Sequence, residues 1–396
     1  MFSSDIKTHF LQPSKDIKNN QIEFKIPAGM VLVSPPRLLE LGGTAATAGE
    51  YPRTAGVMSI VDSIRILDGQ TELENIGLVP QLTAFKNMNC TNDKAISEVN
   101  PSYGCRIGLS KERDEFIRPT FTVENFELKT AATDVDNARL MCNMGRYSGF
   151  FSSGMVSTEK HSHLRIIFKL NKGKYTTVND WVENTKPVLA CDLTDNEETL
   201  KKVNSMDSRT YITMEHDRQH LAAIGANSSS RVRMNNFINK TVNRFFIQTE
   251  ATTGSGDDLL ASFSLPDSTV QVYVNNDNLY PDSGVKQAMR TAFLCDAWGD
   301  LLADFSLQNY KSPASGAAGD NSNDLGFIDE LPLVGLVDYT GGEVMRKVNS
   351  LEVQLERKYS SDASGVLDNQ AIYLNCFGEV IKSIVYTPSG YSMVYV

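Results

Sequence analysis

The sequence predicts an all-β protein built from two β-sandwiches in tandem. Segments in which apolar and polar residues alternate recur from one end of the chain to the other, and turn-forming residues separate them. Alternation with a period of two places every second side chain on the same face of a strand, so each segment reads as a strand with one face on a core. A pattern of hairpin and helix also occurs twice, about half a chain apart. The 396 residues suffice for two such cores.

Three segments show the alternation most clearly. Residues 163–170 place four apolar side chains on one face: Leu164, Ile166, Phe168 and Leu170. Residues 349–357 point Leu351, Val353 and Leu355 one way, opposite Glu352, Gln354 and Glu356. Residues 268–274 behave in the same way. All three are predicted to be half-buried strands.

Two hairpins are predicted, and each leads into a helix. In residues 63–73, Asp68-Gly69 lies between two alternating runs, and this dipeptide favours the positive φ angles of a type I′ turn. Residues 270–280 are expected to turn through Asn275 to Asn278. The best helical segments, Leu78–Met88 and Val285–Leu302, directly follow the two hairpins.

This shared order suggests an internal duplication. Thr83-Ala84-Phe85 follows the first hairpin and Thr291-Ala292-Phe293 follows the second, at an offset of 205 to 208 residues between corresponding positions. We therefore expect two domains, 1–195 and 196–396, with an N-terminal arm before the first sandwich. Their linker should lie within 172–208, where residues 192–198 are polar and charged, and residues 312–323 should form an exposed loop. The eight-stranded jelly roll is the commonest sandwich of this kind, with a few short helices in loops.

Composition narrows the possible functions. The net charge is −10, and the N-terminal stretch mixes lysines with aspartates, so direct nucleic-acid binding is not expected. No two of the six cysteines form a CxxC pair, and we expect buried thiols: Cys90, Cys105, Cys142, Cys191, Cys295 and Cys376. No charged-then-apolar leader and no apolar run near 18 residues is present, so synthesis in the cytosol is expected.

His216-Asp-Arg-Gln-His220 is the sharpest candidate for chemistry. On a helix, two histidines four residues apart share one face, as in the zinc sites of metallohydrolases, with Asp217 in the place of the general base. The preceding residues 209–214 read as a strand, however, and no third ligand follows. We interpret the segment as a polar loop or strand end, and keep a metallohydrolase as an alternative.

The other candidates are weaker. His161 and His163 could face one side and bind a metal ion, but a solvent-exposed entry to a strand is the simpler interpretation. The glycine-rich segment 42–49 lacks the Lys-Ser/Thr ending of a phosphate-binding loop, and Asp257-Asp258 does not match a calcium loop. Trp181 and Trp298 are expected to be core or interface anchors. No catalytic, cofactor-binding or metal-ligating residue is predicted.

Several segments resemble one family. The C-terminal segment 371–396 carries an aromatic-bearing strand, a second strand with an Ile-Val core and a Gly turn into a final strand. It resembles the ending of the double jelly-roll major capsid proteins of double-stranded DNA viruses. Residues 270–281 look like the second-domain hairpin of that family, and residues 147–151 leading into 164–170 are similar to the close of its first domain. The nearest likeness is to the capsid proteins of virophages, polinton-like viruses and adintoviruses.

The resemblance implies a structural protein of the virion. Three copies would form a homotrimer, a pseudo-hexagonal capsomer of an icosahedral capsid. Partners would be neighbouring capsomers, penton and minor capsid proteins, and an internal membrane beneath the shell, toward which the N-terminal arm would face. A β-rich attachment or lectin-like protein that binds a receptor or glycan remains the alternative of another class.

Overall fold

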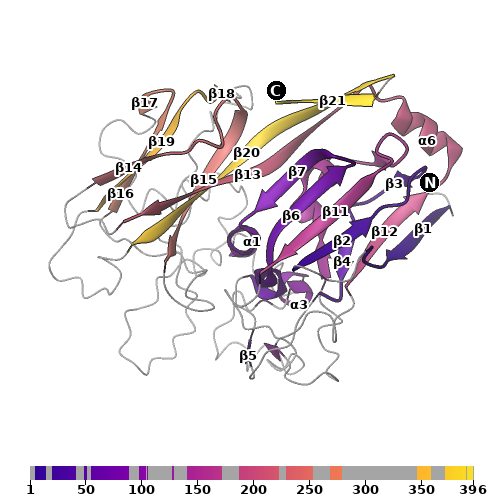
Figure 1. The fold of residues 1–396 in the computed structure, drawn as a ribbon, viewed down its shortest axis with the longest axis horizontal. Helices are drawn as coiled ribbons and strands as arrows, with labels where there is room; N and C mark the ends of the chain where they lie inside the picture. The colour runs from indigo at the N-terminus through magenta and orange to yellow at the C-terminus, as the bar shows by residue number, and fades with distance from the viewer. Residues whose placement is uncertain are drawn as a thin grey trace.

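A computed structural model describes residues 5–14, 20–41, 49–50, 55–88, 98–103, 105, 127–128, 141–171, 187–222, 229–252, 268–278, 346–357, 371–388 and 390–395. Two β-sandwiches lie side by side, the first on the right of Figure 1 and the second on the left. Within the described residues, no helix is long and apolar enough to cross a membrane.

Two sheets form the first sandwich. In one, β12 (Val188–Thr194) pairs with β1 (Ile6–Leu11) on one side and with β3 (Val31–Leu32) and β4 (Arg37–Leu39) on the other. Beyond these, β10 (Val156–Ser157) pairs with β3, and β9 (Met141–Asn143) pairs with β4. In the other the order is β2 (Gln21–Lys25), β11 (Leu164–Leu170), β6 (Val61–Asp68) and β7 (Thr71–Gly77).

The second sandwich repeats this plan. Its first sheet has the order β13 (Ser208–Leu221), β20 (Ile372–Thr387), β15 (Thr241–Ala251) and β18 (Arg346–Lys347), and β21 (Gly390–Tyr395) pairs with the far end of β20. Its second sheet has the order β14 (Ser229–Arg233), β19 (Leu351–Arg357), β16 (Ser268–Val274) and β17 (Asp277–Asn278). In the described part of the chain, eight strands of each half follow the same order once β3 is counted with β4 and β9 with β10, and β5, β8 and β21 are set aside. Numbered along each half, the two sheets have the orders 1-8-3-6 and 2-7-4-5. The eight-stranded jelly roll is thus present twice.

Short helices and one small sheet lie outside this framework. The helices are α1 (Val79–Met88), α3 (Asn100–Tyr103), α5 (Gly149–Ser152) and α6 (Glu197–Asn204), with 3-10 helices at Gly56–Ile60 and Met144–Arg146. The small sheet pairs β5 (Gly49–Glu50) with β8 (Glu127–Leu128). The helix predicted at Leu78–Met88 is confirmed.

Both predicted hairpins are present. The turn between β16 and β17 is Asn275-Asn276, and both residues have positive φ angles, of 52° and 70°. The turn between β6 and β7 is Gly69-Gln70, so Asp68 ends the strand and only Gly69 has a positive φ, of 58°. The type I′ turn placed at Asp68-Gly69 was therefore one residue too early. The two turns lie in corresponding positions of the repeat.

The alternating segments bury the faces that the sequence predicts. Leu164, Ile166 and Phe168 of β11 are at most 1% exposed, and they belong to the core of the first sandwich. Leu351, Val353 and Leu355 of β19 are buried in a separate core in the second sandwich. Burial of these side chains supplies the main favourable free energy of folding.

The predicted linker was wrong in part. Residues 188–194 are not part of a linker but form β12, because Leu189, Cys191 and Leu193 are buried while Asp192 is paired with Arg37 at 2.9 Å. The polar residues in and after this strand made its alternating pattern hard to recognise from the sequence. Near the start of the chain, residues 6–11 form the edge strand β1.

Several other predictions fall on residues outside the described part of the chain. These are the helix at Val285–Leu302, the loop 312–323, Asp257-Asp258, residues 42–48 of the glycine-rich segment, Trp181 and Trp298. The division at 195 and 196 remains a prediction, although strands before residue 195 and after residue 207 sort into different sandwiches.

Candidate functional site at the junction of the two sandwiches

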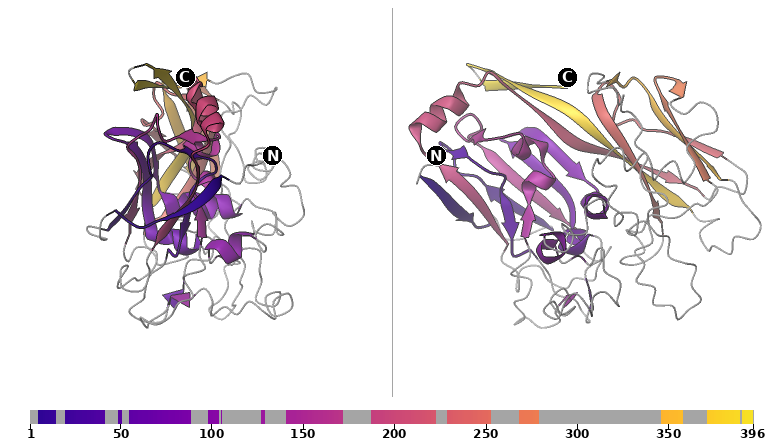
Figure 2. Two further views of the ribbon diagram at one scale, coloured as in Figure 1. Left: turned by 90° about the vertical axis from the view of Figure 1, so that its right-hand side faces the viewer. Right: turned by 180° about the vertical axis from the view of Figure 1, so that it is seen from behind.

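The two longest strands, β13 and β20, cross from the second sandwich onto the first, which Figures 1 and 2 show from opposite sides. They pair over fourteen positions, from Ser208↔Val385 to Leu221↔Ile372. At one end Leu221, Leu374 and Cys376 belong to the core of the second sandwich. At the other end Tyr211, Met214, Phe377 and Ile384 belong to the core of the first. One sheet therefore contributes to two cores, and we call the region where it meets β7 and α5 the junction.

Two glycines allow the close approach at the junction. A Cβ atom at Gly149 would lie 1.7 Å from the backbone oxygen of Ile212 on β13. A Cβ atom at Gly77, the last residue of β7, would lie 2.1 Å from Cε1 of His216. Side chains at these positions would push β13 away from the first sandwich.

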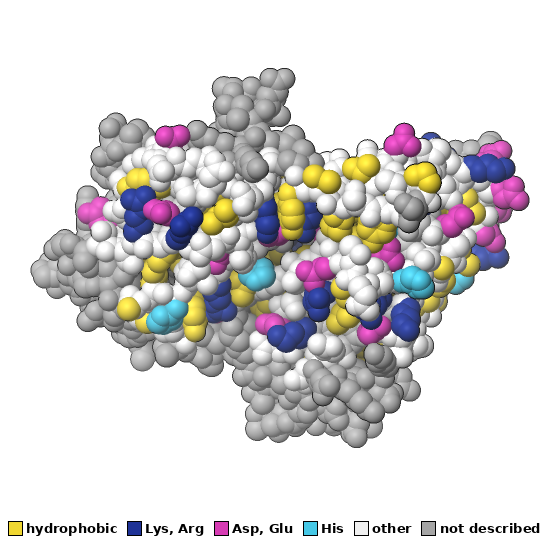
Figure 3. Space-filling model, turned by 45° about the horizontal axis from the view of Figure 1, so that its top comes forward, with side chains coloured by type: hydrophobic (Ala, Val, Ile, Leu, Met, Phe, Trp, Pro, Cys, Tyr) yellow, Lys and Arg dark blue, Asp and Glu magenta, His cyan; other side chains and the backbone are white. Residues whose placement is uncertain are grey.

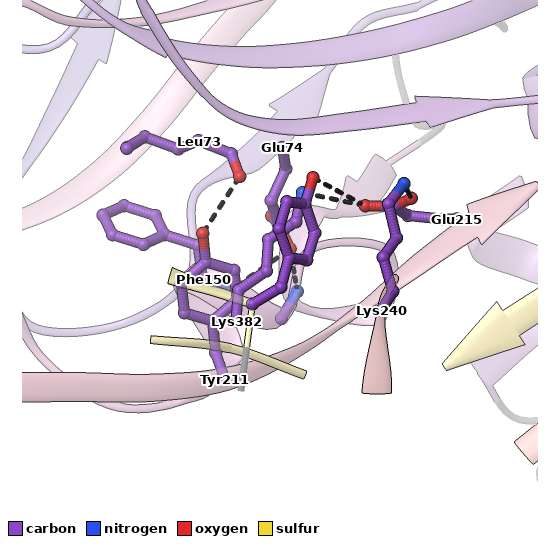
Figure 4. A network of polar contacts seen from close by, with 9 residues as sticks. Leu73, Glu74, Phe150, Tyr211, Glu215, Lys240 and Lys382 are labelled. Carbon is purple, nitrogen blue, oxygen red and sulfur yellow. Dashed lines mark hydrogen bonds and ion pairs between the residues drawn. The ribbon is translucent and has the colours of Figure 1, made fainter. Parts of the chain in front are cut away.

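Glu74 of β7 is a fully buried carboxylate beside the junction (Figure 4). It accepts hydrogen bonds from the hydroxyl of Ser148 and from the backbone N–H groups of Gly149 and Phe150, at 3.0 and 3.2 Å for the last two. Next to it, the hydroxyl of Tyr211 donates to the backbone oxygen of Leu73 at 2.9 Å. Burial raises the pKa of Glu74, and the hydrogen bonds oppose this only in part.

Arg209 of β13 joins the strand to the carbonyl end of α5. Its guanidinium donates to the backbone oxygens of Phe150, Gly154 and Met155 at 2.6, 2.8 and 2.5 Å, and to Oγ of Ser153 at 2.9 Å. The last carbonyls of a helix lack partners within it, and a cation there is favourable. Arg209 thus fixes β13 against the first sandwich through polar contacts.

A charged cluster lies on the same sheet, and Figure 4 shows its side chains pointing toward one another. Glu215 of β13 pairs with Lys240 and with Lys382 of β20, the latter at 3.0 Å, and the ring of Tyr395 lies within about 5 Å of both lysines. Burial alone would raise the pKa of Glu215, but Lys382 and Lys240 outweigh it and hold this pKa below its ordinary value. The charges are therefore retained inside the fold.

A second polar cluster connects α1 with the second sandwich. Glu250 of β15 is 1% exposed. Its carboxylate accepts from Gln81 of α1, Asn375 of β20 and Arg218 of β13, each at 2.9 Å. Because Gln81 belongs to the first sandwich and the other three residues to the second, this cluster also fixes the relative position of the two.

His161 is not the exposed residue that the sequence suggested. Its ring is fully buried, with Nδ1 2.9 Å from Oδ2 of Asp68 and Nε2 3.0 Å from the hydroxyl of Tyr386. Burial would raise the pKa of Asp68, but the hydrogen bond and charge interaction with His161 outweigh it and lower this pKa. Of this pair of histidines, His163 is the exposed one, as expected. Sequence reasoning missed this contact because Tyr386 lies 225 residues away along the chain.

The metal site imagined at His216 and His220 requires a helix, whereas both residues lie in strand β13. Four residues along a strand span roughly 13 Å, against roughly 6 Å along a helix, so the rings do not converge. His216 instead packs on Gly77, and Oδ2 of Asp217 accepts from the backbone N–H of Asn236 at 3.0 Å. Among the described residues, no group of three or more His, Cys, Asp or Glu could hold a metal ion.

The four cysteines in the described part of the chain, Cys105, Cys142, Cys191 and Cys376, are free and buried, as predicted. Burial raises the pKa of Cys142 and of Cys191 to about 12, so these thiols stay protonated and behave as small apolar side chains.

On the face in Figure 3, basic side chains are scattered among acidic ones. The junction as a whole positions one sandwich against the other.

The C-terminal strand β21 extends a sheet of the second sandwich but packs on the first. β21 pairs with β20, but Val394 and Tyr395 are 47% and 46% exposed. The side chains that it does bury in part, Tyr391 and Met393, contact the core of the first sandwich and not that of the second. The strand therefore joins a sheet of the second sandwich, as the sequence predicts, while its partly buried side chains pack on the core of the first.

Comparison with known proteins was made at the levels of sequence and structure. No protein-family model and no curated protein matches the sequence. PBCV-1 VP54, in a structure fitted into a cryo-EM reconstruction of the virophage Sputnik, has a TM-score of 0.54 and 10% identity, over 100% of this chain and 98% of that chain. The quasi-atomic structure of the PBCV-1 virus capsid gives 0.52 and 9%, over 100% and 98%. The mavirus major capsid protein gives 0.45 and 12%, over 98% and 90%.

At such identities the likeness concerns the fold. The first two similarities extend over the full length of both chains, and the strand order found here is that of a jelly roll in each half. The closer likeness to virophage, polinton-like and adintovirus proteins stays a prediction. The chain has the double jelly-roll fold of viral major capsid proteins.

Proposed function

We propose that this chain is a major capsid protein that assembles into homotrimeric, pseudo-hexagonal capsomers of an icosahedral virus shell. The observation that carries the proposal is the repeated jelly roll, with two sandwiches of the same strand order held side by side, in the fold of PBCV-1 VP54 over the whole chain. Three copies of such a chain present six similar sandwiches around a threefold axis. A tile of this shape suits a lattice in which each unit has six neighbours.

The role of the junction follows from this geometry. A tile can fit its neighbours on all sides only if its two sandwiches keep a fixed relative position. Arg209, the Glu250 cluster and the buried end of β20 provide that rigidity. The work of the protein is then assembly and not catalysis. Its partners would be its own copies, penton and minor capsid proteins and, beneath the shell, a membrane, and its location would be the virion.

The test is the mass and shape of the purified full-length protein. Light scattering after size exclusion should give three times the chain mass, and electron microscopy should show particles with a hexagonal outline. A monodisperse monomer that binds a defined glycan through its loops would instead indicate an attachment protein and would refute the proposal.

A further inference from the structure

The outer face of the sheet β2-β11-β6-β7 balances its charges except at one end. Arg65 pairs with Glu72 at 2.7 Å and Lys169 with Asp62 at 2.9 Å. At the end of β2, however, Lys25 lies directly opposite Arg165 of β11 in the register. Like charges directly opposite each other on neighbouring strands destabilise a sheet. Strand pairing alone gives no reason for this arrangement.

A pocket opens where these two cations meet. Its volume is about 320 Å³, at the lower end of the range for small-molecule sites. The polar side chains that line it are Lys25, Gln70, Ser162, His163 and Arg165, and no carboxylate lines it. Every one of these side chains can donate a hydrogen bond. They approach from three segments of the chain: the end of β2, the β6–β7 turn and the start of β11.

Arg165 is held in place before any ligand arrives. One of its terminal nitrogens donates to the backbone oxygen of Gly69 at 3.0 Å, and the other lies 3.6 Å from Glu23. Glu23 offsets part of its charge, but Nε of Arg165 is buried without a hydrogen-bond partner. A guanidinium that is already oriented loses little entropy on binding, so a weak site gains affinity.

The turn leaves room for a ligand. Gly69 has a φ of 58°, and a Cβ atom there would meet nothing closer than the Cβ of His163 at 4.0 Å. The ammonium of Lys25 is exposed and makes no ion pair or hydrogen bond with any described residue. A group with oxygens pointing in several directions could therefore accept from Lys25, Arg165 and the turn together.

We propose that this pocket binds a tetrahedral oxyanion of the phosphate type, either free or as the headgroup of a phospholipid. A planar carboxylate offers acceptors in one plane, whereas the donors here come from three segments. The anion would lie between Lys25 and Arg165 and remove the repulsion between them. The inference does not depend on the capsid proposal, because it concerns one pocket of the first sandwich.

The test titrates the full-length protein with inorganic phosphate at low ionic strength, followed by calorimetry and by thermal unfolding. We expect saturable binding of one phosphate per chain with an increase in Tm. Lys25→Gln should weaken binding at least tenfold, and His163→Ala, which removes one donor from the pocket, should weaken it as well. Both residues are exposed, so these variants should fold. Lys202→Gln on α6, an equal charge change at an exposed site, is the matched control.

A second arm separates the two sources of the anion. Vesicles of phosphatidylcholine with and without phosphatidic acid are sedimented with the protein. Binding that requires phosphatidic acid and is lost in Lys25→Gln supports a headgroup, whereas saturable binding of inorganic phosphate alone supports the free anion. The proposal is overturned if the protein binds neither inorganic phosphate nor phosphatidic acid vesicles, or if Lys25→Gln and Lys202→Gln behave alike in both arms.

Discussion

The contact between Gly77 and His216 gives the most direct test of the junction. A methyl group at Gly77 would lie 2.1 Å from Cε1 and 2.6 Å from Nε2 of His216. Non-bonded heavy atoms pack at about 3.5–4.0 Å, so the ring or the strand would have to move by roughly 1.5 Å. Overpacking of this kind costs about 1–3 kcal/mol. Gly77 does not have a positive φ, so alanine is compatible with the backbone itself. We expect Gly77→Ala to lower the free energy of unfolding by that amount.

The cause can be isolated with a double-mutant cycle. His216→Ala removes the ring that the new methyl group would meet, so Gly77→Ala should be nearly neutral in that background. The coupling energy between the two substitutions should then reach about 1–3 kcal/mol. Denaturant unfolding of the four proteins measures it, at one protein concentration because assembly makes stability depend on concentration.

Gly69→Ala serves as the control. Its φ of 58° makes any side chain strained, but the added Cβ atom has open space around it. The cost should be about 1 kcal/mol of backbone strain and should be the same with and without His216. If Gly77→Ala is equally destabilising in both backgrounds, or is harmless in the parent protein, β13 does not pack on β7 as described here.

Three further predictions concern the same region. Glu74→Gln should gain stability relative to the parent as pH rises above 4.5, the ordinary pKa of a glutamate. The raised pKa of Glu74 favours its protonated form in the folded state, and that contribution is lost as pH rises through the folded pKa, which unfolding curves of both proteins at several pH values would show. Arg209→Met should cost at least about 2 kcal/mol in the same assay, because it removes the donor of four hydrogen bonds that join β13 to α5 and the residues after it, and a near-neutral result would contradict these bonds. Deleting residues 389–396 should give aggregated protein, since Tyr391 and Met393 no longer cover the first core, whereas soluble oligomers would show that β21 is dispensable.

Local pattern was enough to predict the strands that bury one face. The period-two alternation of Leu164, Ile166 and Phe168 is a direct consequence of a strand with one side on a core. The turn residues Gly69 and Asn275-Asn276 were equally informative, because their positive φ angles suit few other residues. The duplication was visible through the same turns, since each half repeats the order of strand, turn and strand.

The junction could not be predicted from the sequence, because its residues satisfy contacts that are distant along the chain. β13 carries Glu215, Asp217 and Arg218 in a row, which reads as a polar loop. These groups are tolerated in a strand because each has a partner. Glu215 forms an ion pair with Lys382, Asp217 accepts a hydrogen bond from the backbone of Asn236, and Arg218 forms an ion pair with Glu250. The same holds for His161, whose burial depends on Asp68 and Tyr386 together. Buried polar pairs of this kind leave no local periodicity.

The sharing of β13 and β20 between two cores bears on how the protein can assemble. If the second half were separated at the predicted boundary, Tyr211, Phe377 and Ile384 would lose the core that buries them. The two sandwiches are therefore similar in topology but not independent in packing. A flexible pair of sandwiches would have to lose its relative motion on entering a lattice, and that entropy would oppose assembly. If the chain assembles as proposed, the shared sheet would let each copy enter a capsomer with the relative position of its two sandwiches already fixed.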